Sequence, residues 1–556
     1  MVKRLLCMMV LLASAFQGMT AQKREPETRR IDVQSAQPDS LTPSPTVPMP
    51  RLELPEYVII GVASIDLPQF EKQSPEEQVL TKSDFRQLVG TTGRETTELT
   101  ESARKEFMRA SSVSSFGKAR ASLGTYFTPS LDVWLGKRVQ QLDYQVSADY
   151  YRTTGHTYGA DRSKGGIGGT GGFTIPPSQS LAGTRIAMSL TYESDQHKFY
   201  GSPRPLTARA ITQTSGAFAV STSQQNTTSV DVRLEQEEVA ISDSSLEVSE
   251  RISLIHADAR IPLSLVPLRV GLRYQASSIS RKKPQNISNL ELFVGVHRLW
   301  WQNAFLEGSL RAFVSGGSGP TFTLSPFLLG GYRINDQHLL FAGFQPRREL
   351  ESLSGHLQKN LYLSAQSVIP NRDIKVDVSI GVESEWLPWL RSKVTIQYDL
   401  MENDPRYVDS SSSGVWVLKF DGRTERTIGK VELFANVTAN DYFAVTLLVQ
   451  TATSSSTGRN VPYVPAVEVT ASYTHRFPFG VSISPGFMFA GKRWADEANT
   501  NELASYALMN VEVEYRVLER LDVVLRGENL TNTSYETWKG YRAEPLKIYA
   551  GLRYRW

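Results

Sequence analysis

The sequence predicts an all-β fold, a transmembrane antiparallel β-barrel of about 20–22 strands, behind a short N-terminal segment that is periplasmic or lumenal. Three observations support it. Many runs alternate apolar and polar residues, short and long connections alternate between these runs, and the last run alternates up to a terminal tryptophan. Because successive side chains of a strand point to opposite faces, each run describes a wall with one apolar and one polar face.

The first 21 residues are expected to be a secretory signal peptide. They contain Lys3 and Arg4, an apolar core, and small residues before a cleavage point after Ala21. The one cysteine, Cys7, lies inside this segment, so the mature chain has no thiol chemistry. Removing the two basic residues lowers the formal net charge from +3 to about +1, and this near-balance argues against a nucleic-acid partner.

Residues 22–117 are expected to form a proline-rich linker followed by a short N-terminal segment. The linker includes QPDSLTPSPTVPMP at 37–50, and a charged, helix-compatible region ends near Gly117. Between them lies the apolar run YVIIGVASI at 57–65. An extended segment is the favoured interpretation of this run, and a remnant strand or a contact for an energising protein is the alternative.

The segment 118–556 is expected to be the barrel. Its clearest alternating runs are LDYQVSADYY (142–151), IKVDVSIGVE (374–383), KVTIQYDL (393–400) and MNVEVEYRV (509–517). Each run is close to the roughly 9–11 residues that a tilted strand needs to cross a bilayer. The count stays at about 20–22 because regions 199–250 and 403–425 are ambiguous.

The connections between the runs carry a second signal. Short connections are expected at 139–141, 194–198, 301–303, 335–337, 387–389, 438–441, 476–480 and 518–520, and long ones at 154–179, 344–360, 401–414, 492–504 and 531–545. The glycine-rich stretch GGIGGTGG at 165–172 is expected to be part of a flexible surface loop. Short turns on one rim and long loops on the other are typical of outer-membrane barrels, whereas a propeller or solenoid would show a repeat period.

Aromatic residues gather where the runs end. Those expected at the membrane–water interface are Trp134, Trp300, Trp301, Trp386 and Trp389. Ordinary packing is the alternative for any one of them. At the C-terminus, Tyr549, Gly551, Tyr554 and Trp556 are expected to form the signal read by the barrel-assembly machinery. The last strand must close the cylinder against the first, because an open edge cannot exist in lipid.

Charged residues on the polar face of the last runs are expected to point into the lumen. They carry both signs: Glu512, Glu514, Arg516, Arg553 and Arg555. Solvation of the lumen is the favoured interpretation, and paired wall charges that set an electrostatic field in the pore are the alternative.

Two stretches resemble a known family. The ending RGENLTNTSYETWKGYRAEPLKIYAGLRYRW (526–556) resembles that of TonB-dependent receptors, in which an asparagine-leucine-threonine-asparagine turn, a tyrosine and a final G-x-x-Y-R-aromatic strand recur. ASLGTYFTPSLDVWLGKR (121–138), followed by LDYQVSADYYRTTG (142–155), resembles the opening hairpins of the same barrels. The resemblance implies a barrel of about 22 strands in the Gram-negative outer membrane. The family also carries a plug and a TonB box, and neither is identifiable in 22–117, which leaves energy coupling open.

The function expected from these observations is that of an outer-membrane transporter or channel that passes an unidentified solute through a polar lumen. The alternative is a non-transporting scaffold or adhesin that binds a partner through its long loops. An enzyme is not expected, and neither is a metal or a cofactor, because the seven histidines are scattered and no nucleophile-elbow, Walker or dinucleotide motif occurs. The expected partners are outer-membrane lipids and the barrel-assembly machinery, with TonB or a surface lipoprotein as further candidates.

Overall fold

The computed structural model describes residues 115–556, except 177–180, 223–227, 244–245, 264–265, 318–321, 410, 421 and 439. The predicted signal peptide and nearly all of the predicted segment 22–117 therefore lie outside the described residues. No helix in the described part of the chain is long and apolar enough to cross a membrane.

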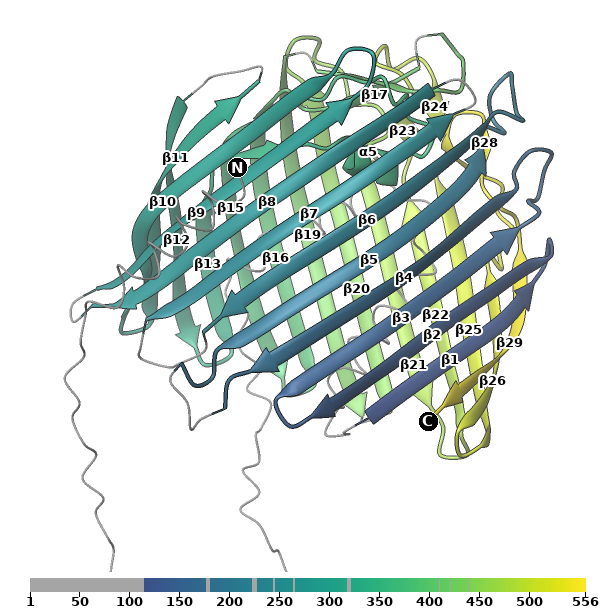
Figure 1. Cartoon of the computed structure of the whole chain (residues 1–556), viewed down its shortest axis with the longest axis horizontal. Helices are drawn as coiled ribbons and strands as arrows, with labels where there is room; N and C mark the ends of the chain where they lie inside the picture. Colours follow the sequence, from purple (N-terminus) through teal and green to yellow (C-terminus); the bar gives the residue numbers. More distant parts are fainter. Residues whose placement is uncertain are drawn as a thin grey trace, which may run out of the picture. The chain divides into compact units, whose positions relative to one another are not determined.

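The described residues form one closed antiparallel barrel (Figure 1). Its sheet holds 23 strands. Two of them, β13 and β14, pair with successive parts of β15 and act as one interrupted strand, so the barrel wall is 22 strands around. The predicted all-β barrel is confirmed. It begins at Ser115, shortly before the predicted boundary at residue 118.

The wall strands follow one another in chain order. They are β1 (Ser115–Gly124), β2 (Thr128–Val139), β3 (Leu142–Thr153), β4 (Arg162–Thr174), β5 (Arg185–Lys198), β6 (Ala208–Ser221), β7 (Ser229–Asp243), β8 (Leu246–Pro262), β9 (Pro267–Ser280), β10 (Gln285–Trp301), β11 (Ala304–Gly316), β12 (Phe322–Asn335), β13 (His338–Phe344), β14 (Arg347–Leu350), β15 (Asn371–Leu387), β16 (Leu390–Glu402), β19 (Arg423–Thr438), β20 (Asp441–Ser454), β21 (Val467–Arg476), β22 (Val481–Ala490), β25 (Tyr506–Leu518), β26 (Leu521–Glu528) and β29 (Lys547–Arg555).

Four smaller elements lie in the long connections. They are the helix α5 (Leu353–Lys359) and the hairpins β17 (Arg406–Val408) with β18 (Val417–Lys419), β23 (Arg493–Trp494) with β24 (Glu502–Leu503), and β27 (Glu536–Trp538) with β28 (Tyr541–Arg542). All four belong to the rim opposite the C-terminus (Figure 1).

The last strand closes the barrel against the first. β29 pairs with β1 from Lys118 opposite Arg555 to Gly124 opposite Tyr549. The seam ends where the Gly117 N–H donates to the Trp556 carbonyl at 3.0 Å and the Trp556 N–H donates back at 3.1 Å. The predicted edge-to-edge closure is therefore present, and the sheet leaves no open edge for lipid to meet.

The two faces of the wall differ as the alternation predicts. In β29, Ile548, Leu552 and Tyr554 are about half exposed on the outer face, whereas Lys547 and Tyr549 are buried on the lumenal face. An outer wall of exposed apolar side chains is stable where hydrocarbon covers it. The polar register then faces the bore.

Two predicted connections are strands instead. The glycine-rich stretch 165–172 lies within β4, and 194–198 forms the end of β5. Glycine leaves room there for side chains from the neighbouring strands: a Cβ at Gly172 would lie 2.1 Å from the guanidinium of Arg185, which pairs with Asp143 at 2.6 Å. The predicted surface loop was wrong because these glycines accommodate ion pairs that cross the strand.

Candidate functional site: the lumen and its loop cap

Three long connections fold together at one mouth of the barrel. We define the cap as the described residues of 351–370, 403–422 and 529–546. The first of these carries α5, and nearly every side chain from 351 to 360 is buried. The cap packs against apolar residues on the lumenal face of β7–β10, namely Val239, Ile241, Val248, Ile279 and Ile287. The mouth with the long loops therefore has a hydrophobic core of its own.

Aromatic rings form the centre of this core. Trp416 is fully buried, and its ring centroid lies 5.2 Å from that of Trp538 and 5.7 Å from that of Tyr541. Its indole N–H donates to the Tyr463 hydroxyl at 3.0 Å. Tyr362 stacks on Tyr541 with ring centroids 3.6 Å apart. Each of the three cap segments contributes at least one of these rings, so their packing is cooperative.

A buried arginine fixes the cap to the wall. Arg209, in β6, is 2% exposed and donates through Nη1 to the carbonyl of Leu361 at 2.8 Å and that of Leu363 at 2.6 Å. Its Nε donates to Asp243 of β7 at 2.6 Å. The guanidinium is therefore paired with a carboxylate and also holds two backbone carbonyls of the cap.

Further wall residues hold the same cap segment by its backbone. The Arg281 guanidinium donates to the Ala365 carbonyl at 3.1 Å and to the Ser367 carbonyl at 2.8 Å. The Glu250 carboxylate accepts the N–H groups of Leu353 at 3.0 Å and Ser354 at 2.8 Å. We call Arg209, Glu250 and Arg281 the latch residues. No sequence pattern singled them out, although each is a charged residue in or directly after the end of a long strand.

Ionic contacts continue along the cap. Arg372 pairs with Glu351 at 3.1 Å, and His356 lies 3.4 Å from the same carboxyl group. Burial opposes ionisation of Glu351, but the charges of Arg372, Lys359 and His356 lower its pKa to about 2. Glu351 therefore stays ionised at neutral pH and holds Arg372 at the foot of the cap.

A cavity of about 610 Å³ lies in the lumen, and the cap forms its roof. Its wall comes from strands at both ends of the barrel sequence, β1–β7 together with β25, β26 and β29. Its roof includes Leu357, Gln358, Lys359, Tyr362 and Trp538. The lining combines aromatic rings with charges of both signs, an arrangement that suits a polar solute with an apolar face.

The predicted lumen-facing residues gather in one ion-pair cluster near the seam. Glu512 pairs with Arg120 at 2.7 Å, and Arg553 binds Glu514 and Asp522. Asp522 lies 2.7 Å from Arg555 and 3.7 Å from Arg516. The structure brings the five predicted residues together through Arg120 and Asp522, which the sequence analysis missed. These two lie on the polar faces of β1 and β26, so the alternation of those strands was the signal that could have found them.

The residues of the predicted assembly signal occupy both faces of β29. Tyr549 is buried in the lumen below the Arg526 guanidinium, which lies 4.3 Å from its ring centroid. Tyr554 and Trp556 are exposed on the outer face, with ring centroids 5.7 Å apart. A Cβ at Gly551 would lie 2.4 Å from the Ala121 carbonyl oxygen, so this position needs glycine for closure. Recognition by the assembly machinery stays a prediction.

Four of the five predicted interface tryptophans lie at the rim with the short turns. Trp301 is 78% exposed, and the Trp386 indole N–H donates to Ser392 at 2.8 Å. Trp300 packs against Phe305, and Trp389 lies in the turn after β15. Their role at the membrane interface stays a prediction.

Trp134 differs from the other four. It lies opposite Lys118 of β1 and Ser147 of β3, and it lines the lumen cavity with both. Its expected position at the interface is therefore corrected, because the register of β2 turns this side chain into the bore.

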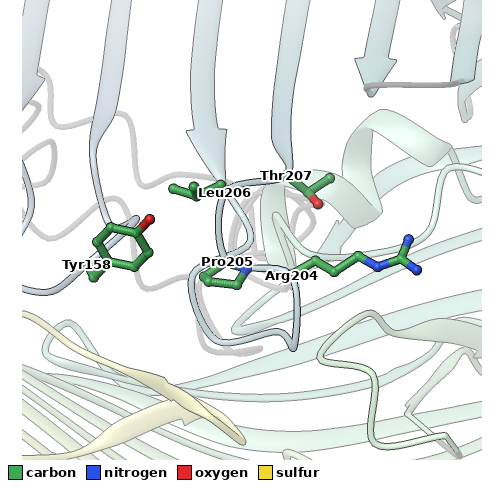
Figure 2. A pocket seen from close by; sticks show the side chains of 5 residues that line it. All are labelled: Tyr158, Arg204, Pro205, Leu206 and Thr207. Carbon is green, nitrogen blue, oxygen red and sulfur yellow. The ribbon is translucent and has the colours of Figure 1, made fainter.

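A second, open pocket of about 390 Å³ lies beside the cap rim. It is lined by Tyr158 from the loop after β3 and by Arg204, Pro205, Leu206 and Thr207 from the loop after β5 (Figure 2). Figure 2 shows the Tyr158 ring across from Pro205 and Leu206. With one cation and no acid, this lining has no pair of groups for acid–base chemistry.

Three histidines of the described chain have separate hydrogen-bond partners. His197 contacts Asp195 at 3.0 Å, His356 contacts Tyr407 at 2.9 Å, and His475 contacts Asp441 at 2.6 Å. Within the described ranges, no three His, Cys, Asp or Glu side chains come together as metal ligands.

No family model matches the sequence, and no curated protein matches it. Solved structures share its fold. The siderophore receptor PiuA from Acinetobacter baumannii is 11% identical with a TM-score of 0.63, over 80% of this chain and 82% of that one. The ferric-catecholate import receptor Fiu from E. coli K12 is 12% identical with a TM-score of 0.62, over 80% and 82%. The FrpB iron transporter from Neisseria meningitidis is 10% identical with a TM-score of 0.64, over 81% and 84%.

These likenesses show the fold. The barrel has the fold of these receptors, which confirms the fold resemblance to TonB-dependent receptors predicted from the two ends of the barrel sequence.

Proposed function

We propose that this protein is a transporter of the Gram-negative outer membrane that takes up a solute through its lumen. The observation that carries the proposal is the cavity of about 610 Å³, with its polar and aromatic lining, beneath a latched cap. A transporter of this width needs a closure that can open, because an unfilled barrel would leak solutes. Energy from TonB, insertion by the barrel-assembly machinery and help from a surface lipoprotein are parts of this proposal.

The alternative function is a surface scaffold that binds a partner through its loops. The packed core of the cap favours this alternative, because a permanently closed mouth passes no solute. Conductance separates the two functions. In planar bilayers, the mature chain is expected to show small or rare openings that become large steps when the cap is released. If current is absent from both the wild type and cap-released variants that remain folded, the scaffold is supported.

The segment 22–117, nearly all of which lies outside the described residues, is tested in the same assay. Deleting residues 22–114 leaves every described wall strand intact. If this deletion alone produces large steps, the segment fills the bore. If the steps appear only when the cap is also released, the cap is the barrier.

Replacing Arg281 with methionine is expected to release one end of the cap. The change removes the hydrogen bonds to the Ala365 and Ser367 carbonyls, at a cost of about 1.5–3 kcal/mol for charge-assisted bonds. The expected result is faster amide hydrogen exchange confined to residues 361–370, together with longer open times in bilayers. Lys282→Met changes the exposed neighbour and serves as the control. Equal exchange in the two variants would contradict the role given to Arg281.

A further inference from the structure

One cation of the cap faces the cavity without a partner. Lys359, the last residue of α5, is 9% exposed and lines the cavity. Glu351, its strongest electrostatic neighbour, is engaged by Arg372 at 3.1 Å and by His356 at 3.4 Å. Among the described side chains, no carboxylate lies within ion-pair distance of the Lys359 ammonium. Burial lowers the pKa of Lys359, since a desolvated ammonium is unfavourable without a counter-charge.

Most other cations on the cavity wall are already ion-paired, and the exception among the described lysines and arginines is Lys118 of β1, which has charges of both signs around it. Arg162 binds Asp195, Lys164 lies 3.6 Å from Glu193, and Lys547 binds Glu544. Each of these carboxylates neutralises its own partner on the wall. Lys359 is the cation of the roof, and no ion pair is found for it among the described residues, so a negative charge brought by a solute would be stabilised beside it.

Gln358, the residue before Lys359, carries a hydrogen-bond acceptor without a donor among the described residues. The residue belongs to the cavity lining, and the acceptor, its amide oxygen, is buried. An unpaired buried acceptor calls for a donor, and a hydroxyl of a solute supplies one.

An aromatic surface completes this corner of the cavity. Tyr362 and Trp538 both line it, and Tyr362 is held rigid by its stack on Tyr541. Burial raises the pKa of Tyr362 to about 12, so its hydroxyl is neutral at physiological pH. A rigid, neutral ring offers its face to the C–H side of a polyhydroxylated ring.

We propose that this cavity binds an anionic, hydroxyl-bearing solute of the sugar-acid class. The Lys359 ammonium binds its carboxylate, and Tyr362 packs against its apolar face. The Gln358 side chain turns toward the cavity on binding, and its amide oxygen then accepts from a hydroxyl. The inference rests on the proposed function, because it names the class of solute that the transporter takes. It assigns a specificity role to two residues of α5 that touch the solute directly.

Binding to the full-length mature protein in detergent tests the site without requiring transport. The probe is glucuronate. Glucose, which is uncharged because it lacks the carboxylate, is the control ligand. Isothermal titration is expected to show glucuronate bound at least tenfold more tightly than glucose. Lys359→Met is expected to remove that preference, and Lys359→Arg, which keeps the charge, is expected to retain it. Lys419→Met removes a more exposed cap lysine that pairs with Glu497 at 2.7 Å, and it is expected to leave binding unchanged.

A second variant, Gln358→Glu, tests the site even if the Lys359→Met protein does not fold. Gln358→Glu places a negative charge beside Lys359 and is expected to weaken glucuronate binding at least tenfold while glucose binding stays the same. Equal affinities for the two sugars in the wild type, or unchanged glucuronate binding in folded Lys359→Met and Gln358→Glu proteins, would overturn the site. Binding without uptake into energised cells would overturn the transporter and leave the site standing. If the Lys359→Met protein still takes up glucuronate, the binding site is overturned and the transporter function stands.

Discussion

The substitution Trp416→Ala is expected to lower the free energy of unfolding of the cap by about 3–5 kcal/mol while the barrel stays closed. Trp416 is fully buried, contacts the rings of Trp538 and Tyr541, and donates to Tyr463, so its loss leaves a cavity and an unpaired hydroxyl. The wall does not depend on this side chain, because its strands are held by their own ladder of backbone hydrogen bonds.

Three measurements check this expectation together. Limited proteolysis should cut the Trp416→Ala protein within the cap, and bilayer recordings should show long openings. Migration in unheated detergent gels should stay that of a folded barrel. Trp301→Ala is the matched control, since it removes a tryptophan that is 78% exposed on the opposite rim. Loss of heat-modifiable migration in Trp416→Ala would show instead that the cap is needed for barrel folding.

Adding one methyl group at Gly551 is expected to prevent normal closure of the seam. A Cβ there would lie 2.4 Å from the Ala121 carbonyl oxygen and 2.6 Å from the Ser122 Cβ, and these atoms belong to the partner strand β1. Overpacking of this kind costs about 1–3 kcal/mol, and more where a backbone atom must move. The effect is large because the whole barrel depends on this single pairing.

The measurement is the fraction of heat-modifiable barrel after refolding of Gly551→Ala into detergent or vesicles. That fraction should fall sharply. Gly486→Ala is the control, since a Cβ at this strand glycine would meet its nearest atom, the Ala471 carbonyl oxygen, at 4.0 Å. Similar yields for the two variants would show that the seam tolerates the added group.

The barrel wall could be predicted from the sequence with few errors. Alternation such as that of 376–382 assigns each residue to a face, and the terminal aromatic strand indicates closure, so the strand count followed. The predicted alternation failed at Ile374, because a register shift between Ile374 and Val376 turns Ile374 to the other face, where it is buried. The errors at 165–172 and 194–198 have one cause. Glycine and polar residues are typical of loops in general, but in a barrel they also occur on lumenal faces crossed by ion pairs.

The candidate site also has a part that the sequence predicts and a part that it does not. Glu512, Glu514 and Arg553 were predicted on the polar face from the period of the strand alone, and in the structure they form ion pairs. Their partners Arg120 and Asp522 depend on which strands become neighbours, and β1 meets β29 only after the chain has closed. Trp134 was misplaced for a related reason: its type suits an interface, but its register directs it into the bore.

The sequence by itself determined the wall of this protein: its strands, its two faces and its closing edge. These features follow from a two-residue period that every short segment carries. The tertiary structure alone decided the cap, the latch residues and the solute-facing corner at Lys359. The Arg209 guanidinium and the Leu361 carbonyl are 152 residues apart, and Lys359 faces the cavity only because the loop turns inward onto the apolar lumenal face of β7–β10. Contacts of this kind depend on the three-dimensional path of a loop, which no local pattern of residues encodes.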